Sequence, residues 1–522
     1  MIERDVTSLA SHLYGSTFIE TEKMMPEQIV KARHSAQSAT SPAPTSTPWP
    51  HDVVWTVAAA SFGFAVVQLD VTIVNVALPA IAKALGAQLA GLQWVVDAYA
   101  LCFAAFLLSA GSLGDRIGAR RIYLAGMTVF ATASLACGLA PSAGFLIAAR
   151  AVQGIGAAAM MPSSLALINH ATGHDASLRA KAISWWTAAG SIAIAAGPVI
   201  GGLLLSITSW RSIFLVNLPI CLLGAVLAFK ITDTAPDRST DHKATTRSTT
   251  RRGFDPLGQL LAILALGTLT AAMIEAKPLG LTHPIVVIAA VIGVTASIAF
   301  VAVEARIAAP LLPLHFFRRP GFSISVLYGI TVNLSYYGIV FVLSLYLQRV
   351  LNYTAIQTGL AYLPLTAGFF AVNLLSGWWV GKAGSRPAMV VGGLVDALGF
   401  ALLFLLGSQS AYWLMLPAFL LMPGGMGLGV PAMTAAIMGS VEKSASGIAA
   451  AVSTATRQAG GAIGVALFGA LAGDDPGHVV AGMHLSAIIA ICLLVLAAGL
   501  AAFGLPVSPA KIDHEGKRIP RR

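Results

Sequence analysis

The chain has 522 residues, of which 57% are hydrophobic and only 10% are charged, and its formal net charge is +10. A soluble domain carries about 25% charged residues, so the composition excludes a soluble protein and predicts an all-α integral membrane protein in a lipid bilayer. The basic residues form short clusters between apolar segments rather than one polar face, which argues against nucleic acid as a partner.

The chain begins with a polar segment, residues 1–52, in which Ser, Thr and Pro are concentrated between Ser35 and Pro50. It contains no apolar core of the kind that a signal peptide needs, and we expect a disordered cytoplasmic tail. Fourteen apolar segments of transmembrane length follow. Their expected ranges are 53–81, 90–112, 122–140, 143–168, 182–206, 212–230, 255–275, 284–304, 321–344, 356–380, 388–408, 412–438, 445–472 and 482–504.

The Lys and Arg residues predict the orientation of these spans. An even number of spans places both termini on one side, and 26 of the 32 basic residues fall on that side, against 4 in the opposite loops. Because basic residues are retained in cytoplasmic loops, we expect both termini in the cytoplasm and the protein in the inner (plasma) membrane, crossing it many times.

Ionisable side chains inside spans are costly and usually functional. Asp70, Asp97 and Arg150 lie in the first, second and fourth spans, and Gln153 follows Arg150 by three residues. We interpret these four residues as candidates for proton coupling and for recognition of substrate charge. Two alternatives stay open: Asp70 forms a structural hydrogen bond to a neighbouring helix, and Asp97 is exposed to water at the outer end of its span.

The segment GSLGDRIGARR, residues 111–121, falls in the expected loop between the second and third spans. Its Arg residues anchor the loop on the cytoplasmic side, and its glycines permit close packing of helix ends. Asp115 can meet either a nearby Arg or the positive end of a neighbouring helix, which we expect near Ser444 and Ser446. The alternative is a solvated turn whose charges only set the topology.

Small residues form a stripe on the fifth span. Gly190, Ala193, Gly197 and Gly201 share one helical face, which lets two helices approach closely in lipid, and Pro198 removes a backbone donor and can bend the helix.

Later spans hold further polar candidates. Asn333, Asn373 and Arg457 fit either the lining of a cavity or hydrogen bonds between helices, and Asp396 in the eleventh span is left unassigned.

Nothing in the sequence points to an enzyme. No nucleotide-binding loop follows a strand, since GGMGLG at 424–429 lies inside a span. No spacing of Cys and His suggests a metal site, and the four Cys residues lie in apolar runs as small hydrophobic side chains. We therefore expect no metal or cofactor, and an ion gradient as the source of energy.

An internal repeat divides the chain. GWWVGKAGSR at 377–386 matches GSLGDRIGAR, 266 residues earlier, and QAGGAIGV at 458–465 matches AAGPVIGG at 195–202. Two similar halves are typical of transporters with a site at the repeat interface. The interval is too long for six spans, which predicts two inserted spans between two six-span halves.

These motifs resemble the major facilitator superfamily, and most closely its fourteen-span drug–proton antiporter branch. The resemblance rests on GSLGDRIGARR, ARAVQGIGAA (149–158), GSIAIAAGPVIGG (190–202), LDVTIVNVALP (69–79) and WRSIFLVNLP (210–219). It implies a monomer with two pseudo-symmetric six-helix bundles and an inserted helix pair. The expected parts are a tail (1–52), a bundle (53–230), a linker (231–254), the inserted pair (255–304), a second bundle (305–504) and a tail (505–522).

The resemblance also implies roles for two motifs. The first is a conformational latch formed by Gly111, Gly114, Asp115, Arg116, Gly118 and Arg120. The second is an antiporter motif, at which the two halves close one end of the cavity, formed by Gly190, Gly197, Pro198 and Gly201.

The implied function is proton-coupled export of hydrophobic small molecules, such as lipophilic cationic drugs, by alternating access. One alternative is a dedicated exporter of a single metabolite or natural product. A third, from another class, is a membrane sensor or assembly partner that does not transport.

Replacing Asp115 by Asn tests the latch. We expect transport to fall while the amount of protein in the membrane stays near that of the wild type, because only the charge at the helix end is lost. Substrate efflux and membrane abundance, measured in the same cells, check this prediction, and efflux at the wild-type rate would contradict it.

Overall fold

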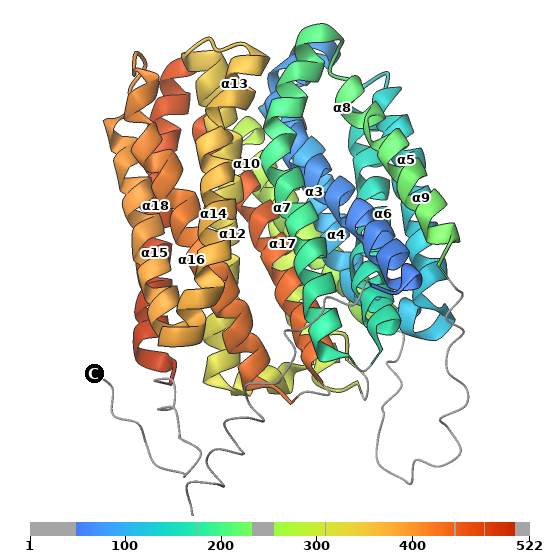
Figure 1. Cartoon of the computed structure of the whole chain (residues 1–522). Helices are drawn as coiled ribbons and strands as arrows, with labels where there is room; N and C mark the ends of the chain where they lie inside the picture. The colour runs from blue at the N-terminus through green and yellow to red at the C-terminus, as the bar shows by residue number, and fades with distance from the viewer. Residues whose placement is uncertain are drawn as a thin grey trace, which may run out of the picture. The chain divides into compact units, whose positions relative to one another are not determined.

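The long apolar segments form helices that lie side by side along one direction (Figure 1). Helices are expected, because a backbone in lipid must satisfy its hydrogen bonds within its own segment. The structure, a computed structural model, describes residues 49–173, 175–231, 255–307, 310–442, 445–473 and 475–506. Most of the expected tails (1–52 and 505–522) and linker (231–254), and Ser444, lie outside the described residues.

The helices of the first half precede the linker. Their bounds are α3 (His51–Leu85), α4 (Leu89–Ile117), α5 (Ala119–Gly138), α6 (Ala143–Thr172), α7 (Ala176–Ile207), the short α8 (Ser212–Leu215) and α9 (Asn217–Phe229). We call the end at which α3 begins the lower end and the opposite end the upper end, as they stand in Figure 1.

The remaining helices follow the linker. The segment expected as an inserted pair forms α10 (Pro256–Leu279) and α11 (Pro284–Glu304), and we keep the name inserted pair for these two helices. The second half contains η2 (Leu314–Arg318), α12 (Pro320–Leu345), η3 (Tyr346–Val350), α13 (Ala355–Ala361), α14 (Leu363–Ala383), α15 (Ser385–Ala401), η4 (Leu402–Leu405), η5 (Tyr412–Leu414), α16 (Leu416–Ser440), α17 (Ser446–Ala472) and α18 (Pro476–Gly504).

The two halves use the same packing scheme. In the first half α3 packs against α7, while α4 and α5 both pack against α6. In the second half α12 packs against α17 in the same way, while α14 and α15 both pack against α16. The halves meet where α4 contacts α17 and where α7 contacts α13. This correspondence agrees with the repeat that the sequence indicates.

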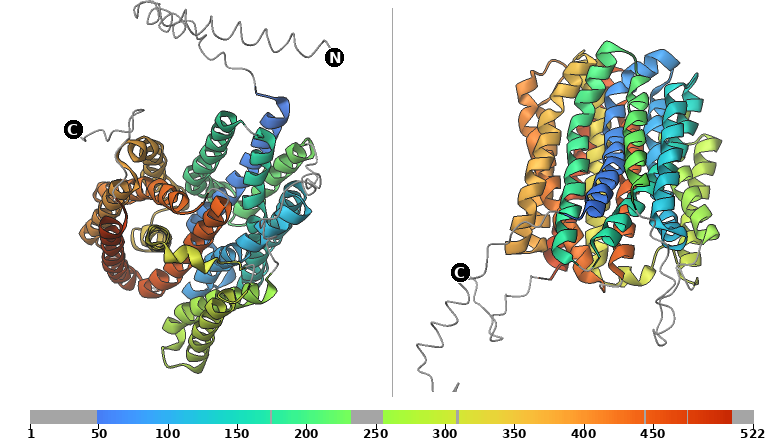
Figure 2. Two further views of the ribbon diagram at one scale, coloured as in Figure 1. Left: turned by 90° about the horizontal axis from the view of Figure 1, so that it is seen from below. Right: turned by 45° about the vertical axis from the view of Figure 1, so that its right-hand side comes forward.

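The inserted pair lies at the edge of the helix bundle (Figure 2, left). Its α10 contacts α4 of the first half and α17 of the second. Gln259 of α10 donates to the carbonyl of Ala105 at 3.0 Å and accepts from Ser109, and Trp94 donates to Glu275 at 3.3 Å. These bonds attach α10 to α4, whereas α11 is mostly exposed.

Among the described residues, thirteen helical segments are long and apolar enough to cross a membrane. The expected segment 445–472 is a helix, α17, but it is not among the thirteen. Its composition follows from its position, since α17 packs against α4, α10, α12, α16 and α18. A helix surrounded by protein needs small and polar residues for packing more than it needs lipid-facing apolar ones.

The predicted loop at residues 111–121 is wrong, because almost all of this segment is helical. The helix α4 continues to Ile117 and α5 begins at Ala119, so only Gly118 between them leaves the helical conformation, with φ of 101°. The second copy repeats this break at Gly384, with φ of 88°, between α14 and α15. Hydropathy alone ends a span at its first charges, although the helix backbone continues beyond the apolar part.

Arg120 has a structural role beyond setting the topology. Its guanidinium donates to the carbonyls of Ala228 and Phe229, both at 3.1 Å, at the end of α9. A helix end leaves such carbonyls without intrahelical partners, and a cation there interacts favourably with the helix dipole. Arg120 therefore joins the start of α5 to the end of α9.

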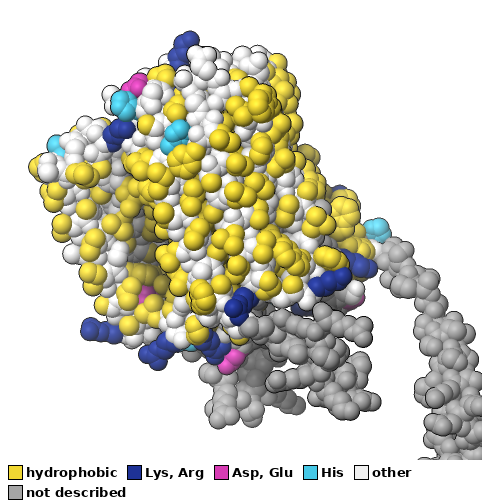
Figure 3. All heavy atoms as spheres, turned by 90° about the vertical axis from the view of Figure 1, so that its left-hand side faces the viewer, with side chains coloured by type: hydrophobic (Ala, Val, Ile, Leu, Met, Phe, Trp, Pro, Cys, Tyr) yellow, Lys and Arg dark blue, Asp and Glu magenta, His cyan; other side chains and the backbone are white. Residues whose placement is uncertain are grey.

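The surface of the described part is banded. On the face in Figure 3, hydrophobic side chains cover the middle of the bundle, while Lys and Arg gather mainly at the lower edge. Lys230 and Lys382, both near that edge, place their ammonium groups 4.2 Å and 3.9 Å from the ring centroids of Trp55 and Trp378. Such basic and aromatic pairs are typical of a membrane–water interface.

The glycine between α4 and α5 generates a stability prediction. Replacing Gly118 by Ala forces a side chain into a conformation that L residues rarely adopt, so we expect a loss of about 1–3 kcal/mol. The melting temperature in detergent should fall. Gly377→Ala is the matched control, because a Cβ there meets nothing within 4 Å inside a regular helix. Equal melting temperatures for the two variants would contradict the prediction.

Candidate functional site

An ion pair is buried in the middle of the first half. Asp70 of α3 and Arg150 of α6 join their side chains in a salt bridge, and both residues are almost fully buried. Arg150 also donates to the backbone carbonyl of Val95 at 3.1 Å. Its guanidinium carbon lies 4.3 Å from the ring centroid of Tyr99, within the range of a cation–π interaction. Three helices, α3, α4 and α6, therefore meet at one guanidinium group.

Amide and hydroxyl groups complete this ion pair. Gln153 accepts from Arg150 at 2.8 Å and donates to Asp70 at 2.9 Å, and Asn217 of α9 also donates to Asp70 at 2.9 Å. The hydroxyl of Ser134 on α5 accepts from Gln153 at 3.2 Å and from Asn217 at 3.0 Å. Asp70 is therefore held by two amide donors, from α6 and α9, in addition to Arg150.

The structure thus brings Asp70, Arg150 and Gln153 together. The structural alternative for Asp70, a hydrogen bond to a neighbouring helix, is present in the geometry, together with the ion pair. Sequence reasoning missed Ser134 and Asn217. Asn217 lies in the motif WRSIFLVNLP, so the only signal was an Asn inside an apolar segment. Nothing in the sequence marks Ser134 as a functional residue.

Asp97 of α4 differs from Asp70. It is fully buried, so the alternative of an exposed residue at the outer end of the span is wrong. Among the residues that the structure describes, neither of its carboxylate oxygens has a hydrogen-bond partner. The burial arises because α4 packs along its length against α6 and α17. A buried carboxylate without a partner is costly when it is ionised.

Two cavities lie between the halves, with Asn75 and Tyr337 in the walls of both. The larger has an empty volume of about 500 Å³, open solvent included, between α3, α4, α6, α12 and α17, and its polar lining residues are Asn75, Asp97, Tyr99, Arg150, Tyr337 and Gln458. The smaller has an empty volume of about 340 Å³, again with open solvent included, between α3, α7, α12 and α14, with Thr72, Asn75, Tyr336, Tyr337, Tyr362 and Thr366 in its walls. Asp97 and Arg150, which both belong to the first half, therefore line the same cavity.

Above the cavities the two halves are joined by hydrogen bonds. Gln93 of α4 donates to the carbonyls of Val465 and Ala466 of α17, at 3.1 Å and 2.8 Å. Gln348 donates to the carbonyl of Val76 at 3.0 Å, and Ser344 donates to Asn75. All of these groups lie in the upper halves of their helices, so these hydrogen bonds join the two halves toward the upper end.

The glycine stripe on α7 faces α3 of the same half. A Cβ at Gly190 would clash with the ring of Phe64, and Cβ atoms at Gly197 and Gly201 would lie within 3.3 Å of Ile73. The stripe therefore lets α7 lie directly against α3, as the spacing predicts.

The neighbouring part of α7 contacts the second half. A Cβ at Gly359 of α13 would meet the carbonyl of Pro198, and one at Gly202 would lie 2.6 Å from that of Ala355. The predicted antiporter motif thus lies where α7 contacts α3 and where α7 contacts α13.

The remaining candidates are dispersed through the second half. Asn333 is buried and donates to the carbonyl of Gly329 at 2.8 Å, and the side chain of Arg457 packs against Gly329. Asn373 of α14 lies against Gly427 of α16. Asn333, Asn373 and Arg457 are not among the residues that line the two cavities.

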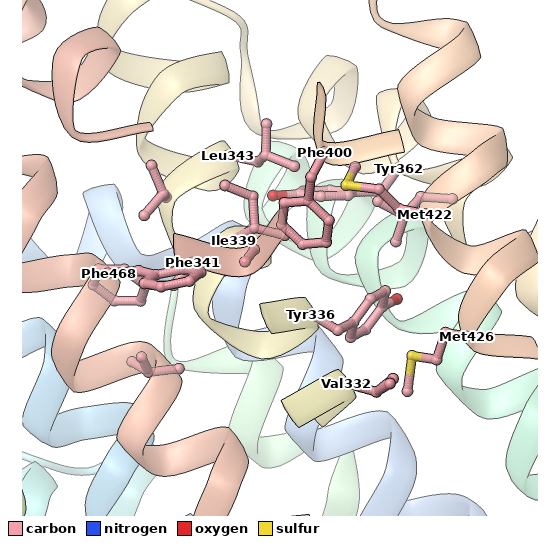
Figure 4. Close-up of a cluster of buried hydrophobic side chains, with 14 of the residues drawn as sticks. Val332, Tyr336, Ile339, Phe341, Leu343, Tyr362, Phe400, Met422, Met426 and Phe468 are labelled. Carbon is pink, nitrogen blue, oxygen red and sulfur yellow. The ribbon is translucent and has the colours of Figure 1, made fainter. Parts of the chain in front are cut away.

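A large apolar cluster occupies the interior of the second half (Figure 4). Tyr336, Tyr362, Phe400, Met422 and Met426 belong to it and come from α12, the junction of α13 with α14, α15 and α16. Among the described residues, no group of three or more His, Cys, Asp and Glu could hold a metal ion.

Comparison with known proteins identifies relatives. Residues 60–465 match the family described as Major Facilitator Superfamily. The chain is 35% identical over 443 residues to the methylenomycin A resistance protein of Bacillus subtilis, which covers 85% of this chain and 91% of that protein. It is 37% identical to the multidrug resistance protein Stp of Mycobacterium tuberculosis, over 80% of this chain and 75% of that protein.

Two further matches extend the comparison. The tetracenomycin C resistance and export protein of Streptomyces glaucescens is 31% identical over 83% of this chain and 77% of that protein. The crystal structure of a D-xylose–proton symporter matches with a TM-score of 0.63 and 16% identity, over 89% of this chain and all of that chain. This last likeness shows the fold alone.

The buried ion pair generates the next prediction. Asp70→Asn leaves Arg150 as an uncompensated buried charge, and breaking a buried pair in this way costs about 3–5 kcal/mol. The melting temperature in detergent should fall strongly, whereas Ser134→Ala, which removes only a hydroxyl group, should cost about 1 kcal/mol. The double variant Asp70→Asn/Arg150→Gln should recover part of the loss. A double variant less stable than Asp70→Asn would refute this explanation.

Proposed function

The chain belongs to the Major Facilitator Superfamily and is a multi-pass membrane transporter rather than an enzyme, and on this basis we propose that it is a proton-coupled antiporter that exports hydrophobic compounds, lipophilic cations among them. Its relatives are named for resistance to antibiotics or for their export. The proposed location is the plasma membrane, with the lower end and both termini in the cytoplasm. The gathering of basic residues at the lower edge supports this orientation.

One observation carries the proposal, namely the unpartnered carboxyl group of Asp97 in the wall of the larger cavity. The nearby guanidinium of Arg150 is already neutralised by Asp70. When Asp97 is ionised, the cavity therefore holds one negative charge, and aromatic rings such as those of Tyr99 and Tyr337 also line its wall. A carboxylate beside aromatic faces suits a lipophilic cation.

Competition for Asp97 provides the coupling. A proton bound by the carboxyl group removes the charge that holds a cationic substrate, and a bound cation in turn favours the ionised form. Each ligand thus promotes release of the other. Alternating access then exposes the same group first to one side of the membrane and then to the other. Asp70, Arg150 and Gln153 hold α3, α4 and α6 in register around this group.

Two motifs are assigned to the conformational change. We assign the α7 glycine stripe, with Pro198, to closure of the upper end, where α7 contacts α13. We assign Asp115 and its neighbouring residues Gly111, Gly114, Arg116, Gly118 and Arg120 to a latch at the lower end. The break at Gly118, with Arg120 joining α5 to α9, supports a defined helix junction there. A monomer suffices for this mechanism, since both halves belong to one chain.

A dedicated exporter of one natural product is the second candidate. Two of the relatives reported above are named for a single antibiotic each, methylenomycin A and tetracenomycin C. A panel of unrelated lipophilic compounds separates the candidates in a host that lacks its own efflux pumps. Resistance to several compounds supports broad export, and resistance to one compound supports the dedicated exporter.

Purified protein in lipid vesicles tests the coupling through Asp97→Asn. The variant should fail to accumulate substrate against its gradient when a proton gradient is imposed, because no proton exchanges at this position. It should still exchange a labelled neutral lipophilic substrate for the unlabelled compound without a gradient, since such a substrate needs no carboxylate for binding and the path through the protein remains.

Gradient-driven accumulation at the wild-type rate in Asp97→Asn would refute the role of Asp97. The matched control is Cys102→Ala, a change on the same helix at a residue that does not line either cavity. This control should retain both activities.

A further inference from the structure

The second half contains a buried carboxyl group that the proposed mechanism does not use. Asp396 of α15 is 2% exposed, and among the described residues its oxygen Oδ2 has no hydrogen-bond partner. The neighbouring helix α16 passes directly beside it, because a Cβ at Gly425 would lie 2.6 Å from the Cβ of Asp396. The absence of a side chain at Gly425 thus leaves room for this carboxyl group between the helices.

The helices around Asp396 bring no cation to it. The helices packed most closely on α15 are α16 and α18, and neither segment contains Lys or Arg. In α18 the ring of His484 bonds the carbonyl of Leu406 at 2.9 Å, near the upper end, and His478 lies earlier in the helix, paired with Asp475. The nearest titratable groups of α12 are the hydroxyls of Tyr328 and Tyr336.

The other basic groups of the second half are directed elsewhere. Arg386 of α15 is ten residues before Asp396, at the lower end, and Lys382 of α14 lies over Trp378. Arg457 of α17 packs against Gly329 of α12. An ionised Asp396 therefore has no counter-charge from these helices, and burial alone opposes its ionised form.

A tyrosine connects Asp396 with the smaller cavity. Tyr336 of α12 lines that cavity. In Figure 4 its ring lies below Phe400 and beside Met426, the residue after Gly425, which packs against Asp396. Phe400 follows Asp396 by one turn of α15, so the two side chains share a helix face. The hydroxyl of Tyr328, whose ring packs beside Gly393 of α15, is buried without a hydrogen-bond partner among the described residues.

We propose that Asp396 is a second proton-exchanging group, located in the second half and connected with the cavity between the halves through Tyr336. In the exchange step the carboxylic acid gives its proton to the Tyr336 oxygen, while the Tyr336 hydroxyl passes its own proton to the cavity. Asp396 is left as a carboxylate, and the reverse step restores the acid. Each half then supplies one titrating carboxyl group, Asp97 from the first and Asp396 from the second.

Infrared spectroscopy of the full chain in lipid vesicles tests the site without substrate or gradient. The carbonyl stretching band of a buried carboxylic acid should decrease as the pH is raised. This decrease should be absent in Asp396→Asn and present in Asp396→Glu, which retains a carboxyl group. Tyr336→Phe should keep the band but slow its response to a pH jump at least tenfold, because it lacks the hydroxyl that relays the proton.

Two results would overturn the proposal. One is an Asp396→Asn difference spectrum that equals the wild-type spectrum. The other is an Asp396 band that stays constant at every pH, which identifies a permanently protonated structural group.

The transport consequence rests on the proposed antiport and is measured separately. In vesicles that show coupled transport, Asp396→Asn should lower the number of protons exchanged per substrate, and an unchanged ratio refutes this consequence. If the wild type shows no gradient-driven transport, the proposed function fails, while the infrared result still decides whether Asp396 exchanges protons.

Discussion

The ion pair between Asp70 and Arg150 is the interaction on which the first half depends. A guanidinium group in the interior of a helix bundle requires a negative partner and an acceptor for each of its remaining donors. Satisfying these requirements draws α3, α4 and α6 together, and Asn217 and Ser134 add α9 and α5. The spacing of five helices is thus set by the needs of one buried charge. The same pair neutralises Arg150, which leaves Asp97 as the remaining acidic group in the wall of the larger cavity.

The interface between the halves follows a different principle. It has few charges and is formed by small residues and backbone carbonyls, as where Gly202 faces Ala355 and where Gln93 bonds two carbonyls of α17. Backbone contacts of this kind bring helices close without locking them through long side chains. Neutral hydrogen bonds contribute about 1 kcal/mol each, so an interface with few of them can open and close. Rigid halves with a weakly bonded interface are the arrangement that alternating access requires.

The sequence predicted the helices, the repeat and the positions of Asp70, Arg150 and Gln153, because apolar length and intramembrane charge are local properties. Prediction from the sequence failed where the burial or the contacts of a residue depend on helices that are distant in the chain. The burial of Asp97 depends on α17, whose Val465 is 372 residues from Gln93 on the same helix as Asp97. The role of Asn217 depends on α9 returning beside α3. The helical ends of α4 and α5 were missed because charged residues at a membrane surface end the hydropathy signal but not the helix. For Asn333, Asn373 and Arg457 the choice between the lining of a cavity and hydrogen bonds between helices stays open in the sequence, because a sequence shows polarity but not direction.

The inserted pair has a mechanical consequence. Gln259 and Glu275 attach α10 to α4 near both of its ends, whereas α10 meets α17 by packing. When one half tilts against the other, α10 must move with the first half and slide along α17. The helix α11, most of whose surface is exposed, moves together with α10. Each transport cycle would then displace acyl chains on that flank. The work of this displacement depends on lateral pressure, so the composition of the surrounding bilayer would enter the turnover rate directly.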